Sequence, residues 1–73
     1  MARLPQASGD ELVRALVRAG YEVVAQRGSH VKLRRADRTL TVPLHGSKPL
    51  KKGTLRAILR DAGLSASQLA ELL

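Results

Sequence analysis

The stretch RGSHVKLRRADRTLTVPLHG, residues 27–46, decides the fold of this chain. From His30 onward, apolar and polar residues alternate, which is the pattern of a strand with one face against a core. The segment 36–38 is polar and short enough to turn the chain, and the alternation resumes over residues 39–42. The stretch therefore predicts two antiparallel strands joined by a tight turn. The residues expected to face the core are Val31, Leu33, Leu40 and Val42.

The residues before this hairpin predict a helix and one further strand. Ser8 and Glu11 have the spacing of a capping box, and apolar residues then recur at helical intervals. We expect a helix over residues 9–19, ended by Gly20. Residues 21–26 are rich in β-formers and are followed by a Gly-Ser pair, so they predict a strand that turns back into the one beginning at His30.

The residues after the hairpin predict two helices. The Gly, Ser and Pro residues of segment 44–49 indicate a loop. A helix is expected to begin near Lys51 or Thr54 and to end at Gly63, and a last short helix to begin at Ser65. The order predicts an α+β fold, α-β-β-β-α with a short C-terminal helix, in which helices cover one face of a three-stranded antiparallel sheet.

The positive charge of the chain is concentrated in its middle. The 73 residues are expected to form one domain, residues 1–73, with a formal net charge of +7. Residues 1–24 sum to zero, whereas residues 25–60 hold ten basic residues against Asp37 alone, a local charge of +9. Such a surface attracts polyanions, of which nucleic acid is the leading candidate.

The composition excludes several classes of protein. The absence of cysteine removes disulfides and thiolate metal ligands, and two histidines separated by a strand do not suggest a metal site. The single aromatic residue, Tyr21, excludes base recognition by several stacked rings. No apolar run approaches the roughly 20 residues that a membrane span requires. We therefore expect a soluble, cytoplasmic protein without a cofactor, a metal ion or a membrane partner.

His30 is the residue most suited to chemistry. Histidine transfers protons near neutral pH because its unperturbed pKa is about 6.5. The strand pattern places His30 on the same face as Lys32 and Arg34, where two cations would attract a phosphate. A histidine at the start of a strand is more often structural, so the pattern alone leaves both interpretations open.

Four motifs in order give the chain a resemblance to a known family. They are GY at residues 20–21, GSH at 28–30, VPLH at 42–45 and LKKGTLRAILRDAGLS at 50–65. In this order the motifs resemble the HicA family of small bacterial toxins, also described as YcfA-like. The resemblance implies a fold like that of double-stranded-RNA-binding domains and cleavage of messenger RNA. It also implies neutralisation by a cognate HicB antitoxin.

The resemblance implies roles for particular residues. The catalytic histidine of the family follows Gly-Ser, a position that His30 occupies here, and His45 matches the VPLH position and is a secondary candidate. Cations around these histidines could hold the RNA backbone without sequence preference. The residues expected to bind nucleic acid are Arg27, Ser29, Lys32, Arg34, Lys51, Lys52 and Arg56.

Two other functions fit parts of the sequence. The fold could bind RNA without cleaving it, in which case the basic face would only recognise RNA shape. Alternatively, LRAILRDAGLSASQLAELL, residues 55–73, resembles the helix-turn-helix of DNA-binding regulators. Against that interpretation, residues 65–73 contain no basic side chain for base edges or phosphates. Lys51, Lys52 and Arg56 could also form only a solvated helix face, or could bind an acidic antitoxin instead of RNA.

Overall fold

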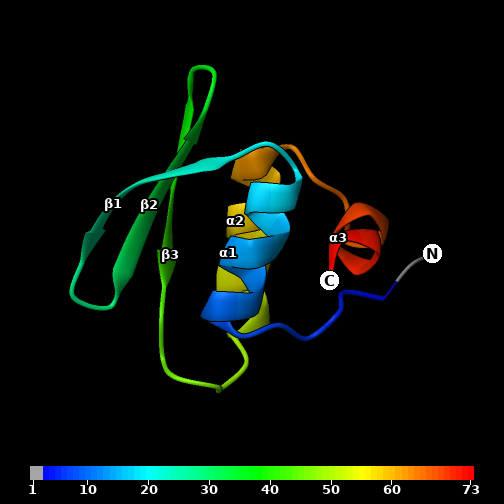
Figure 1. The fold of residues 1–73 in the computed structure, drawn as a ribbon. Helices are drawn as coiled ribbons and strands as arrows, with labels where there is room; N and C mark the ends of the chain where they lie inside the picture. The colour runs from blue at the N-terminus through cyan, green and yellow to red at the C-terminus, as the bar shows by residue number, and fades with distance from the viewer. Residues whose placement is uncertain (1–2) are drawn as a thin grey trace.

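The computed structural model describes residues 3–73 and confirms the predicted order of elements. The three strands form one antiparallel sheet in the order β1-β2-β3, and Figure 1 shows α1 and α2 together on one side of it. This is the α+β arrangement of double-stranded-RNA-binding domains, as expected. The elements are α1 (Gly9–Arg18), β1 (Glu22–Arg27), β2 (His30–Arg35), β3 (Arg38–Pro43), α2 (Lys52–Ala62) and α3 (Ala66–Leu72).

Strands β1 and β3 each differ from the prediction by one residue at both ends. β1 begins after Tyr21, because the backbone N–H of Tyr21 donates to the carbonyl of Leu16 at the end of α1 (2.9 Å), while its buried side chain donates to the carbonyl of Ala62 in α2 (3.1 Å). β3 extends from Arg38 to Pro43 and so includes a proline beyond the predicted residues 39–42. Proline is tolerated there because β3 is an edge strand, where a missing N–H does not interrupt the sheet.

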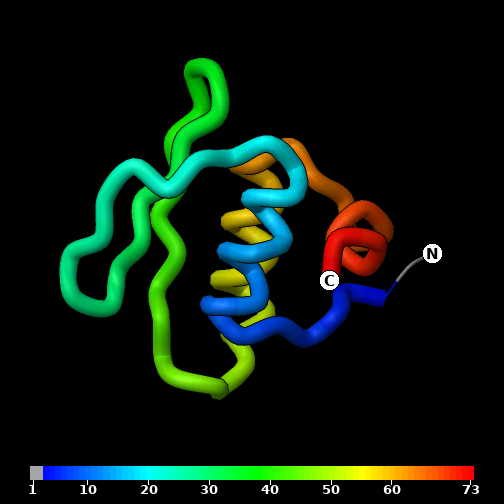
Figure 2. Tube along the Cα trace, viewed as in Figure 1, coloured from blue at the N-terminus to red at the C-terminus, as the bar shows by residue number. Residues whose placement is uncertain are grey.

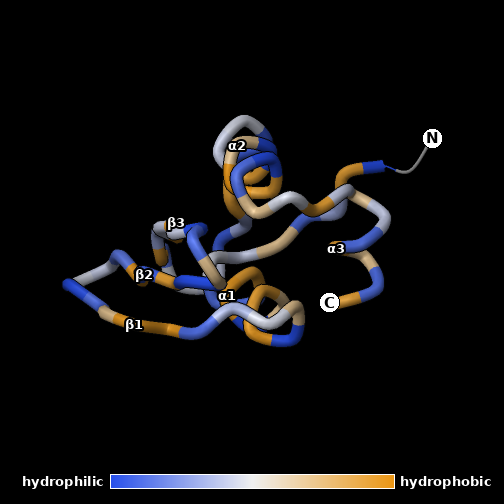
Figure 3. Tube along the Cα trace, turned by 90° about the horizontal axis from the view of Figure 1, so that it is seen from above, coloured by the Kyte–Doolittle hydropathy of each residue, from blue (hydrophilic) through white to orange (hydrophobic). Residues whose placement is uncertain are grey.

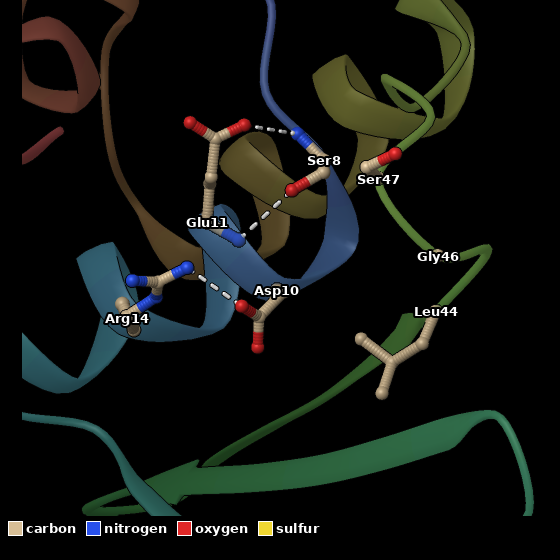
Figure 4. A pocket seen from close by; sticks show the side chains of 7 residues that line it. All are labelled: Ser8, Asp10, Glu11, Arg14, Leu44, Gly46 and Ser47. Carbon is tan, nitrogen blue, oxygen red and sulfur yellow. Dashed lines mark hydrogen bonds and ion pairs between the residues drawn. The ribbon is translucent and has the colours of Figure 1, made fainter.

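Helix α1 begins with the predicted capping box, shown in Figure 4. The backbone N–H of Ser8 donates to the carboxylate of Glu11 at 3.0 Å, and the Ser8 hydroxyl accepts from the backbone N–H of Glu11 at 3.2 Å. The backbone N–H of Ser8 and, to a lesser extent, the nearby Ser8 side chain hold the pKa of the Glu11 carboxyl below its ordinary value of 4.5. Ser65 and Gln68 form the same motif at the start of α3.

The core is built from aliphatic side chains of both helices and of β2 and β3. The four residues predicted to face inward are all buried, and their neighbours on β2 and β3 are exposed or only partly buried. Helix α3 closes the far side through Leu69, which is fully buried. Burying each such side chain contributes about 1.5–3 kcal/mol. The largest fully buried side chains are Leu12, Leu16, Leu33, Val42, Leu55 and Leu69.

Strand β1 lies outside the cover of the helices. All six of its residues are exposed, including Val23 and Val24, and the pairing with β2 is irregular between Val23 and Ala25. Figure 3, seen from above, shows the β1–β2 hairpin projecting beyond the helices. The strand therefore adds little to the core, and its main effect is to make β2 the central strand.

The two hairpin turns lie at different ends of the sheet, as the tube in Figure 2 shows. The β1–β2 turn is the pair Gly28-Ser29, with Gly28 at φ +58°, a backbone conformation that glycine adopts without a steric cost. The β2–β3 turn is Ala36-Asp37, where Ala36 has φ +52°. A side chain at a positive φ destabilises the turn, so this alanine is not the optimal residue there.

Three arginines, which we call the helix-end arginines, donate hydrogen bonds to carbonyls at the C-terminal ends of the three helices. Arg35 donates to Ala19 at the end of α1 (2.7 Å), Arg38 to Asp61 in α2 (3.1 Å), and Arg18 to Leu72 in α3 (2.6 Å). The guanidinium of Arg35 also lies over the ring of Tyr21, 5.4 Å from its centroid. A cation at a helix C-terminus is stabilising because the last carbonyls are unpaired and carry partial negative charge.

Candidate nucleic-acid interface

The outer face of the sheet, which is the face away from the helices, carries a row of polar residues along its central strand. His30, Lys32 and Arg34 alternate with the buried Val31 and Leu33, so their side chains all project from the outer face. The three outer residues are exposed. The structure thus confirms the alternation on which the prediction for this strand depended.

Both neighbouring strands add residues to this row. In an antiparallel sheet, directly paired residues project from the same face. Arg27 of β1 pairs with His30, and at the other end of the row Glu22 pairs with Arg34. Strand β3 places Pro43 beside His30, and Thr41 and Thr39 beside the two cations. We call Arg27, Lys32 and Arg34 the sheet-face cations.

His30 is held in this row by the turn before it. The pair Gly28-Ser29 reverses the chain in two residues, so that His30 is the first residue of β2 and lies opposite Arg27. The carbonyl of Ser29 accepts a hydrogen bond from the N–H of Leu44 at 2.6 Å, which joins this turn to the chain leaving β3. Ser29 is exposed, and it takes part in this hydrogen bond through its backbone carbonyl.

The row has the charge that a phosphate backbone requires. The sheet-face cations carry three positive charges, and the only acidic residue paired into the row is Glu22, beside Arg34 and at the opposite end from His30. Paired side chains have Cβ atoms about 4.5–5.5 Å apart. The Arg27 guanidinium can therefore reach a phosphate that His30 contacts, and this end of the row is the more positive.

The other predicted residues lie elsewhere, in two groups. His45 and Lys51 line a cavity of about 480 Å³ between the end of β3 and the start of α2, which we call the loop cavity. Lys52 and Arg56 lie on the helix side of the molecule, where they line a hollow of about 660 Å³ together with Arg3. The predicted set is thus divided between the outer sheet face, the loop cavity and the surface of α2.

Sequence reasoning missed two features of the site. Lys48 lines the loop cavity with His45 and Lys51, but loop residues have no periodicity from which to predict a shared position. Pro43 links the two regions, because it pairs with His30 and also lines the loop cavity. The VPLH motif was the one sequence signal that pointed to this segment.

A further hollow, of about 630 Å³, lies between the first turn of α1 and the β3–α2 loop (Figure 4). Its lining includes Asp10 and Glu11 beside Arg14, which is paired to Asp10 at 2.6 Å. Two carboxylates do not favour a polyanion here. Among residues 3–73, no group of three or more acidic or histidine side chains could hold a metal ion, and no helix is long and apolar enough to cross a membrane.

One comparison with known proteins identifies the family. The sequence model described as "HicA toxin of bacterial toxin-antitoxin" matches residues 9–64, which is well over half of the chain. The match runs from the first residue of α1 to just beyond the end of α2, and so it includes the sheet face and the loop cavity. No curated protein matches the chain significantly. The motifs, the fold and this match agree, and the chain belongs to the HicA family of bacterial toxins.

Proposed function

We propose that this toxin is an endoribonuclease that cleaves messenger RNA without a metal ion, with His30 as a general acid or base. The observation that carries the proposal is the position of His30 on the central strand, exposed and next to the sheet-face cations. The family supports the role of a toxin, and an arrest of translation in the cytoplasm would follow from cleaved messages. The whole chain would act as a single toxin domain.

Cleavage of RNA without a metal ion requires groups that transfer protons and cations that stabilise the phosphorane. The 2′-OH of the RNA loses a proton and its oxygen attacks the adjacent phosphorus, while the bond to the 5′-oxygen breaks and that oxygen gains a proton. The products are a 2′,3′-cyclic phosphate and a free 5′-hydroxyl. His30 would transfer one of the two protons, and the Arg27 guanidinium beside it would stabilise charge on the phosphorane. Lys32 and Arg34 would hold the next phosphates along the strand.

A HicB-type antitoxin would neutralise this activity by covering the outer sheet face. The sheet-face cations favour an acidic surface on that partner, because complementary charge both directs the encounter and fixes the orientation. Such a partner would compete with RNA for the same residues. Toxin and RNA would therefore separate when the antitoxin is added.

The helix-turn-helix alternative is not favoured by the packing of α3. Leu69 of this helix is fully buried, and Arg18 of α1 donates to its last residue, Leu72. A recognition helix must instead present side chains to a DNA groove. The exposed residues of α3 include Ser67, Gln68 and Glu71, none of which is basic. A non-catalytic RNA-binding module keeps the same surface and differs only in the absence of cleavage.

The test is cleavage of a long single-stranded RNA in EDTA by the wild type, His30→Ala and His45→Ala, with circular dichroism to check that all three are folded. We expect the wild type to cut and to leave cyclic phosphate ends. His30→Ala should lose at least about a hundredfold in rate, the usual contribution of a general acid or base. If the wild type binds RNA but does not cut it, or if folded His30→Ala cuts equally well, the catalytic proposal is wrong.

A further inference from the structure

The loop cavity has the size and position of a ligand site. Its volume of about 480 Å³ lies within the range of about 300–1,000 Å³ that is usual for small-molecule sites. Figure 1 shows the β3–α2 connection, which contributes most of its lining, at the same end of the sheet as the β1–β2 turn. The residues that line it are Pro43, His45, Lys48, Pro49, Leu50, Lys51 and Thr54.

The lining combines two kinds of surface. Two prolines and the buried Leu50 provide apolar walls, whereas His45, Lys48 and Lys51 provide groups that are cationic or become so by protonation. No carboxylate lines the cavity, and within residues 3–73 neither lysine forms an ion pair. A ligand that suits this lining has an anionic group at one end and a flat, weakly polar body at the other. A nucleotide has this chemistry.

The cavity is also close to His30. Pro43, which lines it, pairs directly with His30, and the hydrogen bond between Leu44 and Ser29 (2.6 Å) holds the two segments together. Paired Cα atoms are about 5 Å apart and each extended residue adds at most about 3.6 Å, so the Cα atoms of His45 and His30 are within roughly 13 Å. An RNA strand that crosses His30 can reach the cavity within a few nucleotides.

We propose that the loop cavity binds one nucleotide of the RNA near the cleaved phosphate. The phosphate of this nucleotide contacts Lys48 and Lys51, with His45 beside them, and its base and ribose lie against Pro43, Pro49 and Leu50. The role in cleavage rests on the proposed function, but the binding of a nucleotide does not. The cavity gives the enzyme an apolar surface against which a base can lie, whereas His30, Lys32 and Arg34 on the central strand are all polar.

The first experiment uses adenosine monophosphate and inorganic phosphate as probes, each titrated into the protein and followed by NMR. We expect the nucleotide to shift the signals of Leu50 and Thr54 and to bind more tightly than inorganic phosphate. Lys48→Ala should weaken nucleotide binding about tenfold, the usual effect of losing a hydrogen bond to a charged group. The control is Arg14→Ala, which removes the same charge from an exposed side chain outside the cavity.

Each remaining outcome contradicts the proposal. Equal weakening by both variants would mean that only the net charge matters, and equal binding of the two probes without a response at Leu50 would leave an anion site and no nucleotide site. Should Lys48→Ala fail to fold, Lys51→Ala replaces it.

Cleavage separates this proposal from the proposed function. Lys48→Ala should raise the KM for RNA and change kcat little, because it removes binding that the ground state and the transition state share. An unchanged KM, with His30→Ala inactive, would overturn the nucleotide site alone. A wild type that binds the nucleotide in the cavity but never cuts RNA would overturn the proposed function alone.

Discussion

Replacing Gly9 by alanine should destabilise the protein, although helix propensity alone predicts the opposite. Gly9 is the first residue of α1 and is buried. A Cβ atom added there would overlap the carbonyl oxygen of Pro43 and would lie 3.0 Å from Cδ2 and 3.2 Å from Cα of Leu44. Carbon atoms prefer separations of about 3.5–4.0 Å, and the oxygen belongs to the backbone and cannot rotate away. The helix or the end of β3 must therefore move.

Two opposing contributions decide how much Gly9→Ala changes the free energy of unfolding. Glycine to alanine in a helix is favourable by up to about 1 kcal/mol, because alanine has less conformational freedom to lose. Overpacking a filled site costs about 1–3 kcal/mol, and contact with backbone atoms places this case at the upper end. The net loss should be about 2 kcal/mol. For a domain of this size that corresponds to a fall in Tm of about 8–16 °C.

Gly53→Ala is the matched control. Gly53 lies in the first turn of α2, and a Cβ atom there would meet nothing within 4 Å. This variant should be more stable by about 0.5–1 kcal/mol. Thermal and urea unfolding of the wild type and both variants, followed by circular dichroism, measures the two changes. A Gly9→Ala protein as stable as Gly53→Ala would refute the close approach of α1 to the end of β3.

Three further predictions concern stability. Because the pKa of Glu11 is lowered in the folded state, the ionised carboxylate adds fully to the stability above the unfolded-state pKa near 4.5. This stabilisation is lost as the pH falls through the folded-state pKa. In urea unfolding, the advantage of the wild type over Glu11→Gln should therefore vanish in acid. Ala36→Gly should raise stability by up to about 1 kcal/mol, since glycine tolerates the positive φ; a lower Tm would contradict the turn conformation. Tyr21→Phe removes the buried hydrogen bond to Ala62 and should cost about 1 kcal/mol, and an unchanged urea midpoint would show that this bond is not formed.

The fold was predictable because local signals agreed with one another. The capping boxes at Ser8 and Ser65 and the alternation after His30 each depend on neighbours within four residues, so the sequence contains them. The start of β1 was misplaced because the backbone N–H of Tyr21 still bonds to Leu16 at the end of α1, and its side chain is held by a contact with Ala62, 41 residues away. A contact of that kind has no local pattern.

The candidate site was predictable in part. The position of His30 beside Lys32 and Arg34 follows from the period of a strand. The pairing of Arg27 with His30 follows from the two-residue turn between them. The grouping of Lys48 with His45 and Lys51 does not follow, because it depends on how the β3–α2 loop packs beside α2. The helix-end arginines could not be separated from the sheet-face cations by charge alone.

Those helix-end arginines would limit how strongly the proposed binding of RNA depends on salt. Three of the thirteen basic residues already donate to protein carbonyls, so they release few counterions when RNA binds. For single strands the slope of log K against log salt is about −0.7 per phosphate neutralised. The three sheet-face cations, together with Lys48 and Lys51 of the loop cavity, would then give a slope of about −3.5. A protein this basic by composition would bind RNA with the modest salt dependence of a much less charged one.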